Sequence, residues 1–141
     1  MMEPYDSKRI LLIDRQSHWR EAFAHALRSA GFIVCTLDTY NYVLPQVCLK
    51  GEEPDLVVLG CVLIRPEEQM LITQILARKH HLLVLSISLP WHVMHSLFLQ
   101  GVDDIVDKPH NPATVVDFVN EVLESTVTLN SYWSIERNGI A

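Results

Sequence analysis

The chain has 141 residues, enough for one domain with a hydrophobic core of its own. Its 17 acidic residues outnumber its 11 basic ones, and the formal charge of −6 would repel a phosphate backbone, so direct nucleic-acid binding is not expected. The apolar runs are far shorter than the ~18 residues of a membrane span, and the N-terminus lacks the apolar stretch of a signal peptide. We therefore expect a cytoplasmic protein with no membrane contact.

The first half of the chain alternates apolar runs with helical patterns. They predict, in chain order, a strand at Ile10–Ile13, a helix at Ser17–Ala30, a strand at Phe32–Leu37 and a weaker helix at Asp38–Lys50. Gly31 is placed to cap the first helix, because glycine adopts the left-handed conformation that often ends a helix. Pro45 interrupts the pattern of the weaker helix and shortens or kinks it.

The second half continues the alternation. It predicts strands at Leu56–Leu59, Leu82–Ile87 and Asp104–Val106, and helices at Glu67–Lys79, at Trp91–Gln100 and from Asn111 to about Thr126. Five strand–helix units in succession predict a doubly wound α/β domain, a parallel sheet between two helical layers. We assign residues 1–126 to this domain and residues 127–141 to a C-terminal tail or linker.

Function in such sheets gathers at the carboxyl ends of the strands. The carboxyl edge of the sheet should therefore bring together Asp14, Gly60, Ser86 and the segment from Asp107 to Pro109. The third strand, within PDLVVLGCVL, ends on Gly60, which offers no side chain to a site.

Cysteine and histidine positions do not predict a metal centre. Cys35, Cys48 and Cys61 have no CxxC spacing and lie in apolar surroundings, which is typical of reduced thiols. The histidine pairs His92/His95 and His80/His81 have no neighbouring acid or thiol to complete a ligand set. We expect no metal and no cofactor.

The segments ILLID, PDLVVLG, LLVLSI and GVDDIVDKPHNP, in this order, resemble the receiver domain of two-component response regulators. The resemblance covers residues 8–125, and GVDD…DKP is its most specific part. It implies a flavodoxin-like sheet of strand order 2-1-3-4-5 and a role in phosphorelay signal transduction. A receiver also needs a phosphoacceptor aspartate, two acids that hold Mg²⁺, a hydroxyl and a lysine. The resemblance assigns Asp14 to the metal site, Ser86 to the hydroxyl and Lys108 to the cation.

Three positions depart from the family pattern. The acceptor position is Gly60, the second metal acid is Arg15, and the switch aromatic is Ile105. Gly60 has no nucleophile, and a guanidinium beside Asp14 repels a divalent cation, so we expect neither aspartyl phosphorylation nor Mg²⁺ binding. The residues of this degenerate pocket have structural alternatives as well. For Asp14 we favour a helix-capping role and for Ser86 a structural role, while Arg15 is either solvated or paired with Asp14 or Asp38.

The helix expected at Trp91–Gln100 has more apolar residues than one buried stripe requires. Trp91, Met94, His95 and Phe98 are therefore candidates for an interaction surface. The resemblance implies that this helix, the fifth strand and the fifth helix bind a partner protein or a second copy, and a homodimer is expected.

The sequence predicts a pseudo-receiver: a non-enzymatic response-regulator domain that signals by phosphorylation-independent protein contact or dimerisation. Three alternatives stay open. They are a receiver phosphorylated at a non-standard residue, a small-ligand sensor that uses the rim pocket emptied at Gly60, and a redox switch at Cys61.

Overall fold

The computed structural model describes residues 8–38 and 53–125. Its elements are β1 (Arg9–Asp14), α1 (Ser17–Ser29), β2 (Ile33–Leu37), β3 (Leu56–Gly60), α2 (Pro66–Ala77), β4 (Leu82–Ser86), α3 (Trp91–Gln100), β5 (Asp104–Asp107) and a C-terminal helix over residues 114–125. Every strand and helix predicted within the described ranges is present. The helix predicted at 38–50 falls, apart from its first residue, outside the described residues, and so does the tail at 127–141.

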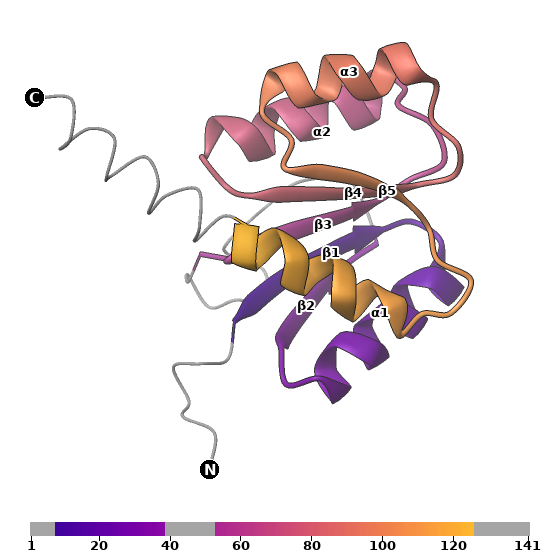
Figure 1. Cartoon of the computed structure of the whole chain (residues 1–141), viewed down its shortest axis with the longest axis vertical. Helices are drawn as coiled ribbons and strands as arrows, with labels where there is room; N and C mark the ends of the chain where they lie inside the picture. The colour runs from indigo at the N-terminus through magenta and orange to yellow at the C-terminus, as the bar shows by residue number, and fades with distance from the viewer. Residues whose placement is uncertain (1–7, 39–52, 126–141) are drawn as a thin grey trace, which may run out of the picture.

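The five strands form one parallel sheet of order β2-β1-β3-β4-β5. In Figure 1, α2 and α3 cover one face of the sheet, and α1 and the C-terminal helix cover the other. The predicted fold class, a doubly wound α/β/α domain with strand order 2-1-3-4-5, is confirmed.

Strand side chains alternate between the two faces and build a core on each side of the sheet. Leu11 and Ile13 of β1 pack with residues of α2 and α3, whereas Ile10 and Leu12 pack with α1 and the C-terminal helix. All five residues of β3 and of β4 are buried, as expected for central strands covered on both faces. The apolar runs of the sequence are thus the centre of the sheet.

Local backbone chemistry determines where the helices begin and end. α1 is followed by Gly31 with φ of +101°, and α3 by Gly101 with φ of +113°. The C-terminal helix begins later than predicted, because Asn111 first forms a turn in which its side-chain oxygen accepts a hydrogen bond from the amide of Ala113 at 3.1 Å. α2 ends two residues early, since Lys79 has φ of +63°.

Gly101→Ala should destabilise the fold by about 1 kcal/mol, because a Cβ is strained at positive φ. A Cβ built at this position meets no atom within 4 Å, so the cost is purely conformational. Gly101→Asn should cost less, since asparagine tolerates the left-handed region better. Urea denaturation of the two variants measures the difference, and equal stability of all three proteins contradicts the assignment.

Candidate functional site

Four sequence-predicted residues lie together at the carboxyl edge of the sheet. Asp14 at the end of β1 is in register with Gly60 at the end of β3. Ser86 at the end of β4 is in register with Asp107, and the amide of Lys108 donates a hydrogen bond to the Ser86 carbonyl at 2.8 Å. This pairing fixes the backbone of Lys108 at the level of the site.

The centre of the site is a buried ion pair. Nζ of Lys108 lies 3.0 Å from Oδ2 of Asp14, and both side chains are only 1% exposed. The ammonium also donates to Oε1 of Gln16 at 3.0 Å and lies 5.4 Å from the ring centroid of Trp19. Acid, amide and aromatic face together surround the lysine with groups that stabilise a positive charge.

The two oxygens of Asp14 have different partners. Oδ1 accepts a hydrogen bond from the amide of Gln16 at 2.9 Å, whereas Oδ2 is buried without a hydrogen bond, so its contact with Lys108 is ionic only. The N-cap of α1 is Gln16, so the prediction that Asp14 caps this helix is wrong. Asp14 binds the amide of the cap residue and serves mainly as the counter-charge of Lys108.

Gly60 lies directly beneath the Asp14 carboxylate. A Cβ added at residue 60 would lie 2.1 Å from Oδ2 and 2.7 Å from Cγ of Asp14, which is far inside van der Waals contact. The carboxylate of Asp14 therefore fills the space in which a side chain at residue 60 would begin. The pocket expected to be emptied at Gly60 is occupied at this point.

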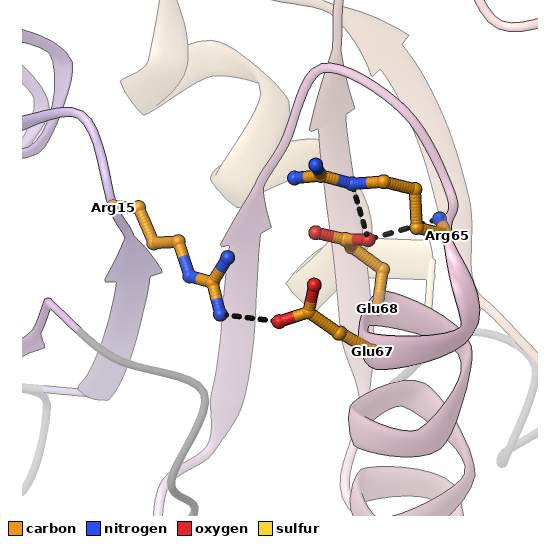
Figure 2. A network of polar contacts seen from close by, with 4 residues as sticks. All are labelled: Arg15, Arg65, Glu67 and Glu68. Atoms are coloured by element: carbon orange, nitrogen blue, oxygen red, sulfur yellow. Dashed lines mark hydrogen bonds and ion pairs between the residues drawn. The ribbon is translucent and has the colours of Figure 1, made fainter.

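Arg15 joins the segment that follows β1 to the first turn of α2. Its guanidinium binds the carboxylate of Glu67 at the start of α2 at 2.7 Å, and the two side chains are 42% and 54% exposed (Figure 2). Of the two alternatives for Arg15, pairing with Asp14 or Asp38 is thus wrong, and the side chain is partly solvated. The hydrogen bond from Arg15 lowers the pKa of Glu67, so this pair stabilises the fold above the ordinary glutamate pKa and loses that effect as the pH falls. The effect is small because the pair is exposed.

A second acid near the end of β3, Glu68, was missed from the sequence. It is 1% exposed, and its Oε1 accepts a hydrogen bond from the amide of Arg65 at 2.9 Å and lies 3.4 Å from the Arg65 guanidinium (Figure 2). Its position three residues after the N-cap is the signal that predicts such a contact. Within the described residues, no group of three His, Cys, Asp or Glu side chains is arranged to hold a metal.

Cys61 follows Gly60 and is 4% exposed. Burial, with a smaller contribution from the charge of Glu68, raises the pKa of its thiol to about 12. Such a thiol carries little thiolate at neutral pH and is a poor redox switch. Among the other cysteines, Cys35 is disulfide-bonded, so the expectation of a reduced thiol is wrong there.

Two further predicted positions are internal. Ile105 at the switch position is 6% exposed, lies opposite Val84 in β4 and packs in the core between the sheet and α2 with α3. Ser86 is 1% exposed. Neither side chain is presented to a partner in this arrangement.

The expected surplus of apolar residues on α3 is confirmed. Trp91, Phe98 and Leu99 are 74%, 44% and 76% exposed. Trp91 stacks on His95 with ring centroids 5.1 Å apart and an angle of 7° between the rings. Met94, by contrast, is partly buried and packs against the core.

No family model and no curated protein matches this chain. Solved structures, however, do match this chain. The response regulator receiver domain protein (CheY-like) from Methanospirillum hungatei JF-1 superposes with a TM-score of 0.71 over 86% of this chain and 98% of that one, at 19% identity. HP1043, an orphan response regulator of H. pylori, gives 0.68 over 83% and 97% at 21% identity, and CheY4 of Vibrio cholerae gives 0.69 over 82% and 98% at 17%. The chain therefore has the receiver-domain fold. No helix in the described ranges is long and apolar enough to cross a membrane.

Asp14→Ala and Lys108→Met should each lower the free energy of unfolding by about 3–5 kcal/mol, because each leaves one buried group without its ionic partner. The double variant should lose clearly less than the sum of the two. A double-mutant cycle by urea denaturation measures the coupling, and additive losses would show that the two charges do not interact.

The Asp14→Ala variant also tests whether the carboxylate of Asp14 fills the space beside Gly60. Gly60→Ala should destabilise the wild-type protein by more than 2 kcal/mol, roughly the range of an overpacked core. In the Asp14→Ala background the cost should be much smaller, because the nearest remaining atom is Cβ of residue 14 at 3.2 Å. An equal cost in both backgrounds contradicts the assignment.

Cys61 should resist alkylation. At pH 8 a thiol of pKa about 12 reacts with iodoacetamide more slowly than an unfolded thiol, by a factor on the order of a thousand. Quantifying the modified Cys61 peptide by mass spectrometry, with and without urea, measures the ratio. Similar rates in both conditions would show that the native thiol is accessible and reactive.

Proposed function

We propose that this chain is a pseudo-receiver: a signalling domain of the response-regulator type that is not phosphorylated on aspartate and acts by protein contact. One observation carries the proposal. The carboxylate of Asp14 lies where the side chain of residue 60 would start, and Lys108 is already paired with it. The cation that a receiver uses for an incoming phosphoryl group is thereby engaged by an internal acid.

The other acids near the site also support this proposal. Asp14 is 1% exposed, which opposes attack on a phosphodonor. Asp55 lies at the opposite edge, where its Oδ2 accepts a hydrogen bond from the amide of Arg9 at 2.7 Å. Glu67 and Glu68 are paired with arginines. With Asp14 neutralised by Lys108, Mg²⁺ finds no carboxylate pair to bind, so we propose a domain without metal, cofactor or enzymatic activity.

The output of such a domain is contact with another protein molecule. The exposed apolar residues of α3 form the binding surface, together with the neighbouring β5 and C-terminal helix. The buried aliphatic Ile105 at the switch position fits a domain whose surface is not reset by phosphorylation. We place this contact in the cytoplasm, with a second copy of the chain or a different protein as the partner.

Incubation with acetyl phosphate and Mg²⁺ should leave the intact mass of the chain unchanged, because Asp14, the acid beside Lys108, is buried and already paired. A phosphorylatable receiver treated in parallel provides the positive control. Amide NMR spectra should likewise be insensitive to beryllium fluoride. The gain of one phosphoryl group on any acid of the site, located by fragmentation, would overturn the proposal in favour of displaced phosphorylation.

A further inference from the structure

The exposed apolar side chains of α3 lie on one side of the helix. Trp91, His95, Phe98 and Leu99 are spaced by three and four residues, which places them in one stripe. All four are exposed, and the stripe includes two of the largest apolar side chains of the domain surface. The opposite side of the helix supplies Leu97 to the core. The side chains of this stripe are therefore not needed to pack the core of the domain.

The aspartate, glutamate, lysine and arginine side chains that α3, β5 and the C-terminal helix expose have one sign. From residue 80 to residue 125 the chain has six acidic residues and a single lysine or arginine, Lys108, whose side chain is 1% exposed. All other described lysines and arginines precede residue 80. The part of the surface built by α3, β5 and the C-terminal helix thus presents no exposed lysine or arginine. We call this surface the acidic face.

Three of these acids form a stripe of their own. Asp117, Glu121 and Glu124 follow helical spacing on the exposed side of the C-terminal helix, opposite the buried Val115 and Val119. No ion pair among the described residues involves any of the three. Their charges are therefore uncompensated in the isolated domain.

β5 continues the acidic face along an edge of the sheet. It contributes Asp104 and Asp107, and Oδ1 of Asp107 accepts a hydrogen bond from the amide of Ser88 at 3.3 Å, three residues before α3 begins. Acidic side chains on a free edge strand also discourage pairing with another strand. The segment that leads into α3 is thus held by a carboxylate of β5.

A second copy of the chain fits this face poorly. A two-fold dimer places the same patch of both copies in contact, so acids would approach acids with no exposed lysine or arginine to pair them. Like charges across an interface cost several kcal/mol. The expected homodimer is therefore opposed by the charges of the surface through which it would form.

We propose that the acidic face binds a different protein, one that presents apolar side chains flanked by lysine or arginine. This rests on the proposed function, a domain that works by protein contact, and specifies the chemistry of the partner. Trp91 and Phe98 anchor the apolar part, since large aromatic residues dominate most interfaces. The acids of β5 and of the C-terminal helix steer the basic part and exclude a second copy.

Two measurements on the full chain test this proposal. Sedimentation velocity should show a monomer at about 50 mM NaCl, where the repulsion between exposed acids is only weakly screened. The second measurement is an NMR titration with a synthetic amphipathic peptide that has leucine at positions i, i+3, i+4 and i+7 of a helix and lysine elsewhere. Its shifts should map to α3, and the same peptide with glutamate in place of lysine should not bind.

Matched variants separate the contribution of the apolar residues of α3 to peptide binding from that of the acids of the C-terminal helix. Trp91→Ala, and the triple change Asp117→Asn, Glu121→Gln and Glu124→Gln, should each weaken the lysine peptide about tenfold. Glu21→Gln on α1, an exposed acid outside the face, should leave its affinity unchanged. These substitutions are at exposed positions, so circular dichroism should show that the variants fold.

Three results overturn the proposal: no binding of the lysine peptide, binding that the triple change does not weaken more than Glu21→Gln, or a dimer abolished by Phe98→Glu. Each of them leaves the absence of aspartyl phosphorylation untouched. Conversely, a phosphorylated site found by mass spectrometry overturns the proposed function while the charge preference of the face stands.

Discussion

The ion pair between Asp14 and Lys108 is the interaction on which the carboxyl edge of the domain depends. It joins the end of β1 to the segment that follows β5, two strands that are not neighbours in the sheet. Because both side chains are buried, neither charge tolerates loss of the other. The pair also explains Gly60: the strand between them must pass without a side chain, since the carboxylate lies over its last residue.

Around this pair, several other groups are engaged within the domain. Arg15 and Arg65 each hold a carboxylate at the start of α2, and Cys61 is buried with a protonated thiol. Exposed acids without an ion pair among the described residues include Asp107 at this edge and Asp117, Glu121 and Glu124 of the C-terminal helix.

The fold was predictable from the sequence because buried strands are continuous apolar runs and because Gly31 and Gly101 mark helix ends. The meeting of Asp14, Gly60, Ser86 and Lys108 followed from the parallel sheet. Their pairing did not, because the choice of partner depends on side-chain directions. Asp14 is not the cap of α1, and Arg15 binds Glu67 and not the predicted acids, since spacing alone does not tell which of several acids a flexible arginine reaches. Buried Glu68, by contrast, is marked in the sequence by its capping-box position.

The contact between Asp14 and position 60 also bears on how such a domain evolves. A side chain at residue 60 would bring its Cβ against a carboxylate that is buried and held by Lys108. Residue 60 can therefore gain a side chain only together with a second change at Asp14 or Lys108. The two positions are coupled, so whether a substitution at residue 60 is tolerated depends on the residue at position 14.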